Sequence, residues 1–178
     1  MKTLAWIFSA LVLTLCLLAA AVLIWPRAPG NPPLPLPPVT AIDRIVVQKA
    51  ARRILLFQNG KMLRSYAVAL GSSPVGDKIR QGDNRTPEGI FRINRKNAAS
   101  AFHLSLGLDY PQAADIARAR AGGYDPGGDI MLHGQPNALP MNAVIRKDWT
   151  AGCIAGSNAE IAEIFAATPI GTEIEIRP

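Results

Sequence analysis

An uncharged apolar run followed by a proline-rich stretch limits any globular fold to the part of this chain after residue 38. The run extends from Leu4 to Trp25 and contains no charged residue. A helix over it would reach roughly 33 Å, enough to cross the ~30 Å hydrocarbon core of a bilayer. Residues 26–38 hold seven prolines in thirteen positions, a density that favours an extended linker. The sequence therefore predicts a signal anchor or transmembrane helix at 1–25, a proline-rich linker at 26–38 and one folded domain at 39–178.

The flanks of the apolar run indicate its orientation. Lys2 stands before the run and Arg27 just after it, a small positive bias that favours an inside amino terminus. A cleaved signal peptide has a shorter apolar region of about 7–15 residues, although residues 19–21, three alanines, offer an alternative processing site. We favour an uncleaved anchor. The expected location is the inner or cytoplasmic membrane, single-pass, with the domain on the periplasmic or extracytoplasmic side.

The charge pattern narrows the partner class. The chain carries a net charge of +6, and its charges are scattered, with no Lys/Arg run interleaved with aromatic residues. Nucleic-acid binding is therefore not predicted. An anionic membrane surface or a cell-wall polymer that carries carboxylates fits the charge better, while a basic surface kept for solubility fits it equally well. The sequence does not indicate an oligomeric state.

Short apolar and β-branched runs dominate the domain, and they predict a mostly β (α+β) fold, either sandwich or barrel. Strands are expected over residues 42–47, 53–57, 63–70, 90–93, 102–106, 129–133 and 171–177. Asn59-Gly60 predicts a tight hairpin turn, and residues 71–89 read as long connecting loops. Two short helices are predicted, one over residues 112–121 and one that begins at a Ser157/Glu160 capping box and continues through Ala167.

Cysteine usage points to a reactive thiol. Cys16 lies inside the apolar run, which leaves Cys153 as the only thiol of the predicted domain. A lone thiol forms no intramolecular disulfide, and the plain alternative is an inert Cys that packs as a small hydrophobe. Gly152 beside it and the polar approach through Asp148, Trp149 and Thr150 favour reactivity instead.

A thiol near pKa 8.5 is mostly protonated at pH 7 and needs a base to become a nucleophile. His133 ends a predicted strand and is the side chain suited to that role near neutrality. Backbone amides near Gly152 and Cys153 are candidates for an oxyanion hole, and the carbonyl of Gly134 is a candidate to orient the imidazole. The expected chemistry is cysteine acyl transfer.

Two motifs carry a family resemblance. His133-Gly134 followed by Thr150-x-Gly152-Cys153, together with the upstream segment GDNRTPEGIF at 82–91, resembles the YkuD-type L,D-transpeptidase catalytic domain over about residues 42–176. The form Asp-Trp-Thr-x-Gly-Cys-Ile-Ala at 148–155 is similar to one branch of that family. The resemblance implies a β-sandwich-like domain that acts on peptidoglycan stem peptides. It also implies that a Cys thioester forms and that its acyl group is passed to an amine, for cell-wall cross-linking or protein attachment.

The resemblance also implies roles for single residues. Cys153 would be the nucleophile, His133 the general base, Gly134 the carbonyl that orients it, and Gly152 an oxyanion contributor. Most members carry a second His where this chain has Ala151, and many carry an Arg where this chain has Ala155. Loss of that Arg removes a planar carboxylate-binding cation, so the choice of substrate and acceptor stays open.

The remaining candidates concern binding. Trp149, Thr150, Ala151 and His103 are candidate substrate contacts, with a structural histidine as the alternative for His103. Ligand spacing does not support a zinc site of His103, His133 and Cys153, and we predict neither metal nor cofactor. The segment 135–147 is expected to form one wall of the cleft. A thiol hydrolase of the same site (endopeptidase, carboxypeptidase or amidase) is the alternative activity, and a non-catalytic wall-binding module is the third hypothesis.

Overall fold

A computed structural model describes residues 38–178 of the chain. The predicted membrane segment at 1–25 and the linker at 26–38, apart from Pro38, lie outside the described residues. Between residues 38 and 178 no helix has both the length and the apolar character needed to cross a bilayer.

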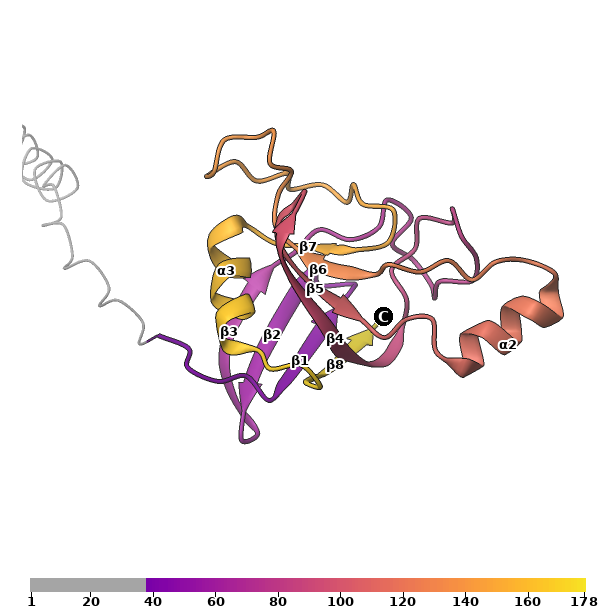
Figure 1. Cartoon of the computed structure of the whole chain (residues 1–178), viewed down its shortest axis with the longest axis horizontal. Helices are drawn as coiled ribbons and strands as arrows, with labels where there is room; N and C mark the ends of the chain where they lie inside the picture. The colour runs from indigo at the N-terminus through magenta and orange to yellow at the C-terminus, as the bar shows by residue number, and fades with distance from the viewer. Residues whose placement is uncertain (1–37) are drawn as a thin grey trace, which may run out of the picture. The chain divides into compact units, whose positions relative to one another are not determined.

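The described residues form a mostly β domain with two short helices, as the sequence predicts (Figure 1). The elements are β1 Arg44–Gln48, β2 Arg53–Gln58, β3 Lys61–Ala67, β4 Gly89–Ser100, β5 His103–Leu108, α2 Ala113–Gly122, β6 Met131–His133, β7 Ile154–Ala155, α3 Asn158–Ala167 and β8 Glu173–Arg177.

The strands run in the order β3-β2-β1-β8-β4-β5-β6-β7. The long β4 joins two sheets, because its first residues pair with β8 and its later residues, from Ile93 onward, pair with β5. The two ends of this order also meet. Ala69, just after β3, and Ala155 of β7 exchange two N–H···O bonds of 2.8 Å each. The two sheets are thus joined on both sides around a common interior.

One hydrophobic cluster fills that interior. It takes side chains from both sheets and from α3, which lies beside them in Figure 1. Ile174 and Ile176 of β8 point inward together, as the alternation of that strand predicts, and Ile161 and Ile164 supply the buried face of α3. Burial of such side chains is the main favourable term in folding. The cluster therefore gives the site a rigid base.

Local sequence signals are confirmed at two turns. Asn59 and Gly60 both have positive φ, 51° and 74°, the geometry that a two-residue hairpin of this hand requires. At the start of α3 the Glu160 amide donates to Ser157 Oγ at 3.3 Å, and the Ser157 amide donates to Glu160 Oε2 at 3.0 Å, which is the predicted capping box.

Most strand ends differ from the prediction by a few residues, and two differences are larger. The strand expected at 90–93 extends to Ser100, because pairing with β5 holds residues whose own sequence has little β character. The two-residue β7, Ile154–Ala155, carries no sequence signal and forms because it lies between β6 and Ala69.

Candidate active site

One cavity of about 650 Å³ contains both residues that the sequence singles out for chemistry. His133 and Cys153 line it together with the predicted contacts Trp149, Thr150 and Ala151. The rest of the lining comes from β4, the turn after it, β5, and the chain just before and at the start of β6: Arg95, Asn97, Ser100, Ala101, Phe102, Ser105, Asp129 and Met131. The fold thus brings a thiol, an imidazole and a polar wall into one space of substrate size.

His133 ends β6 and is held as a neutral base. Its Nδ1 lies 2.7 Å from the carbonyl oxygen of Gly134. Since a carbonyl only accepts, Nδ1 carries the proton and Nε2 is left free to accept one. Burial lowers the pKa of His133, and the bond to Gly134 opposes that shift only in part. The imidazole is therefore unprotonated at neutral pH.

Two aromatic rings enclose the imidazole. Phe102 lies 4.7 Å and Trp149 lies 5.7 Å from the His133 ring, centroid to centroid. They limit the directions from which a proton donor reaches Nε2. A Cβ on Gly134 would lie 2.5 Å from Asn158 Oδ1 and 3.0 Å from the Phe102 carbonyl oxygen, so a larger residue would force the neighbouring chain to shift.

Cys153 is half-buried, and its thiol is protonated at rest. Burial raises the pKa of the thiol and the Asp129 carboxylate raises it further, while the Met131 backbone and Lys78 lower it. Sγ donates a hydrogen bond of 3.4 Å to the Asp129 carbonyl oxygen. Between residues 38 and 178 no hydrogen bond joins Sγ to the His133 ring. Such contacts often tighten only when substrate is bound.

The turn before Cys153 is fixed by Thr150. The Thr150 hydroxyl donates to the Cys153 carbonyl oxygen at 2.7 Å and accepts the Gly152 amide at 3.2 Å. The Gly152 amide is therefore engaged in the free protein, and its oxyanion role stays a prediction. Gly152 has φ +138°, and a Cβ there would lie 2.7 Å from the Arg85 carbonyl oxygen. Only glycine fits.

The polar approach to Cys153 is tied to the chain after β3. The Trp149 and Thr150 amides both donate to the Leu70 carbonyl oxygen, at 3.1 and 3.2 Å. The Asp148 carboxylate accepts the Leu70 amide and the Arg52 guanidinium, each at 2.9 Å. The polar segment 148–150 therefore holds the chain before Cys153 against Leu70 and Arg52.

The upstream motif at 82–89, called the brace below, supports the turn that contains Gly152 and Cys153. Thr86 is fully buried, and its Oγ1 accepts a hydrogen bond from the amide of Gly71. Gly71 in turn packs against Gly152, since a Cβ on Gly71 would lie 3.1 Å from Gly152 Cα. The buried Lys49 ammonium donates to the Thr86 carbonyl oxygen at 2.9 Å and to Glu88 Oε1 at 2.7 Å. The Glu88 carboxylate is thus paired with Lys49 inside the motif.

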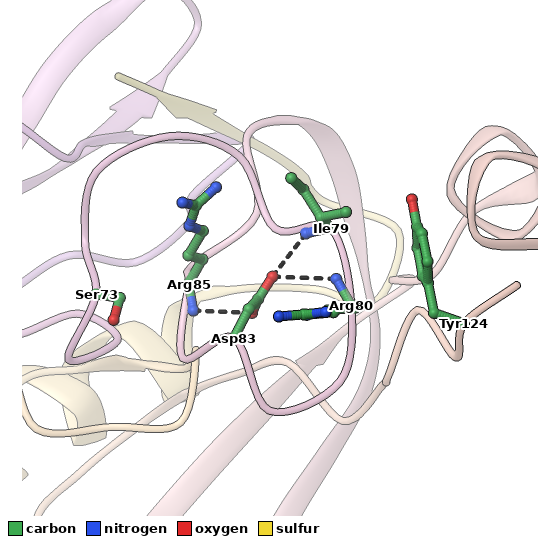
Figure 2. Close-up of a pocket in the computed structure, with 6 residues that line it drawn as sticks. All are labelled: Ser73, Ile79, Arg80, Asp83, Arg85 and Tyr124. Atoms are coloured by element: carbon green, nitrogen blue, oxygen red, sulfur yellow. Dashed lines mark hydrogen bonds between the residues drawn. The ribbon is translucent and has the colours of Figure 1, made fainter. Parts of the chain in front are cut away.

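Asp83 organises the first half of that motif. Figure 2 shows its carboxylate accepting the backbone amides of Ile79, Arg80 and Arg85, and Lys78 Nζ lies 2.8 Å away. Burial alone would raise the pKa of Asp83, but these hydrogen bonds lower it to about 2. The loop surrounds a second cavity of about 430 Å³, lined by Ser73, Ile79, Arg80, Asp83, Arg85 and Tyr124. The motif thus acts as a rigid support next to the site.

Some predicted residues lie outside the cavity. His103 is the first residue of β5 and has φ +62°, and its amide donates to Asn137 Oδ1 at 2.7 Å. Neither His103 nor Gly134 or Gly152 lines the cavity. No group of three possible metal ligands occurs within residues 38–178.

The predicted wall at 135–147 is wrong. None of its residues lines the cavity, and the segment packs instead on the start of α3. The buried Gln135 side chain donates to the Gly156 carbonyl oxygen at 2.7 Å and accepts the Ile145 amide at 2.9 Å. That wall of the cavity is formed by residues from 95–102 instead. These residues are far from Cys153 in the sequence, so their position beside it could not be inferred from the sequence.

Residues 42–176 match the YkuD family, the L,D-transpeptidase catalytic domain. The chain belongs to this family. The resemblance that the motifs carry is thereby confirmed, over the same residues.

Relatives of this YkuD domain are longer than the chain. The Escherichia coli (strain K12) protein named "Putative L,D-transpeptidase YafK" is 32% identical over 107 residues, which cover 59% of this chain and 37% of YafK. The chain thus spans little more than a third of that curated relative.

Solved structures show the same fold. The helical cell shape determining protein Pgp2 from Campylobacter jejuni matches with a TM-score of 0.57 at 23% identity, over 78% of this chain and 48% of Pgp2. The L,D-transpeptidase (residues 123–326) from Xylanimonas cellulosilytica matches with a TM-score of 0.51 at 15% identity, over 80% of this chain and 64% of that chain.

Proposed function

We propose that this YkuD domain is a peptidoglycan L,D-transpeptidase that works through a thioester on Cys153. The observation that carries the proposal is the shared cavity of a protonated thiol and a neutral, oriented imidazole. Family membership supports the stem peptide as substrate.

The first half-reaction forms the thioester. His133 Nε2 takes the thiol proton, Sγ attacks the peptide carbonyl carbon, and the amide C–N bond breaks. The imidazolium then gives its proton to the leaving amine. The fixed Nδ1–H···O bond to Gly134 keeps Nε2 as the only nitrogen that exchanges protons.

In the second half-reaction an acceptor amine attacks the thioester and restores the thiol. If water attacks in place of the amine, the result is hydrolysis, which is the alternative activity. Transpeptidation and hydrolysis share the same thioester intermediate. We also propose that the apolar run at 4–25 places the domain on the extracytoplasmic side of the cytoplasmic membrane, where its wall substrate lies.

Mass spectrometry of the full-length protein with muropeptide tetrapeptides tests the proposal. We expect a covalent adduct and a cross-linked product with the native protein and with Cys16→Ser, and neither with Cys153→Ser. Shortened peptide without a cross-link would assign hydrolysis. An adduct that survives in Cys153→Ser, or no adduct with the native protein, would refute the thioester.

A further inference from the structure

An ion pair that no sequence motif marks lies in the cavity of the candidate nucleophile. Arg95, in the middle of β4, and Asp129, two residues before β6, both line that cavity. Arg95 Nη2 lies 2.8 Å from Asp129 Oδ1, and the two side chains are 43% and 89% exposed. Both charges are therefore open to a ligand that enters the cavity.

The position of the guanidinium is built into the sheet. Arg95 pairs with Gly107 of β5, and a Cβ on Gly107 would lie 2.7 Å from Arg95 Cγ. The missing side chain lets the arginine stem lie across β5 until Nη2 is 3.6 Å from Met131 Sδ on β6. Glycine opposite Arg95 thus directs the charge toward the start of β6.

Asp129 links this charge pair to the thiol. Its backbone is left-handed, with φ +54°, a conformation that Asp tolerates better than most residues and that tends to cluster at functional sites. Its carbonyl oxygen accepts the Cys153 thiol at 3.4 Å while its carboxylate holds Arg95. One residue therefore contacts the thiol through its backbone and the guanidinium through its side chain.

We propose that Arg95 and Asp129 form the acceptor subsite, and that they select an acceptor with a free carboxylate beside its amine. This inference rests on the proposed thioester mechanism. An exposed ion pair contributes little stability and opens readily. The acceptor ammonium then pairs with Asp129, and its carboxylate takes the two-pronged guanidinium of Arg95.

The chemistry balances with the groups present. The bound ammonium loses one proton to solvent, and the resulting amine attacks the thioester carbonyl carbon. As the new amide C–N bond forms and the C–S bond breaks, the second amine proton passes through His133 to the departing thiolate. Arg95 and Asp129 bind and place the acceptor and exchange no proton in this step.

The test is acceptor competition in the full-length protein. Tetrapeptide donor is supplied with glycine and glycinamide at equal concentrations, because glycinamide carries a neutral amide in place of the carboxylate. We expect the native protein to incorporate glycine at least tenfold more than glycinamide. Arg95→Gln should abolish the preference for glycine over glycinamide. Asp129→Asn, which keeps a residue that accepts left-handed backbone, should lower incorporation of both amines relative to hydrolysis.

The matched control is Arg92→Gln. Arg92 is an exposed arginine on the same strand that bonds the Gly171 carbonyl oxygen and does not line the cavity. It should keep the native ratio. Equal use of both amines by the native protein, or an unchanged preference in Arg95→Gln, would overturn the proposal.

A binding measurement separates this inference from the proposed function. In full-length Cys153→Ala, which cannot form a thioester, glycine should shift the NMR resonance of the Arg95 side chain at millimolar concentration, and glycinamide should not. Glycine binding without any thioester in the native protein would remove the mechanism and keep the subsite. A thioester without glycine binding or preference would keep the mechanism and remove the subsite.

Discussion

Gly152→Ala isolates the contact that positions the candidate nucleophile. Gly152 has φ +138°, and the new Cβ would lie 2.7 Å from the Arg85 carbonyl oxygen and 3.2 Å from Ile130 Cδ1. Backbone oxygen cannot rotate aside as a flexible side chain does. Either the cysteine turn or the brace at 82–89 must therefore move by several tenths of an ångström.

The size of the effect follows from two separable costs. The backbone conformation alone costs about 1–3 kcal/mol for a residue with a Cβ, and the forced contact adds about 1–3 kcal/mol. Gly89→Ala is the matched control, because Gly89 has φ +139° but its Cβ would meet only Phe91 ring carbons at 3.5 Å or more. Gly152→Ala should unfold at a temperature lower than Gly89→Ala by about 3–9 °C, at roughly 3 °C per kcal/mol.

Activity should separate the two variants further. Because misplacement by about 1 Å can cost 10²-fold in rate, Gly152→Ala should form the Cys153 adduct at least tenfold more slowly, while Gly89→Ala keeps the native rate. Thermal melting and adduct formation by intact-protein mass spectrometry provide the two readouts. Equal melting temperatures for the two variants, together with a native adduct rate in Gly152→Ala, would refute the reasoning that Arg85 sets the position of the turn.

Four further predictions concern the titration of His133, the reactivity of Cys153, the brace and α3. Burial lowers the pKa of His133, so the unfolded chain binds a proton at this residue before the folded protein does. The free energy of unfolding should therefore fall as pH drops below about 6.5. Urea unfolding from pH 7.5 to 5, compared with His133→Gln, checks this. The raised pKa of the Cys153 thiol should move its alkylation midpoint above the ordinary ~8.5. Thr86→Val should cost about 1–3 kcal/mol by leaving the buried Gly71 amide unpaired, whereas Thr86→Ser should restore most of it in the same melts. Ser157→Ala should cost about 1 kcal/mol in urea unfolding, because it removes the N-cap of α3.

The features that sequence predicts well here are those decided by neighbouring residues. Asn59-Gly60 sets its hairpin through the positive φ that these two residues tolerate, and Ser157 with Glu160 starts α3 through bonds that span three residues. The Gly134 carbonyl reaches His133 Nδ1 because the two residues are adjacent. Each prediction depends on chemistry within one turn of chain.

The features that sequence misses depend on strand pairing. Arg95 reaches the cavity because β4 continues beyond Ile93 and pairs with Gly107 and its neighbours, yet residues 94–100 have no alternating apolar pattern. Asp129 follows two glycines, which suggests only a turn. The wall at 135–147 was inferred from its place between His133 and Cys153 in the sequence, and proximity along the chain did not translate into proximity at the cavity.

The two reacting side chains are held by different parts of the fold, and that explains why a motif outside the cavity accompanies them. His133 is fixed by β6 and by Gly134, whereas the turn of Cys153 rests on the brace at 82–89 and on the chain after β3. Since no hydrogen bond joins Sγ to the imidazole in the described part of the chain, their separation is set by these supports alone. None of residues 82–89 lines the cavity that contains His133 and Cys153. A shift of the Arg85 carbonyl would nevertheless move the nucleophile relative to its base. The motif at 82–89 is therefore as necessary to the proposed chemistry as the His133-Gly134 and Gly152-Cys153 pairs.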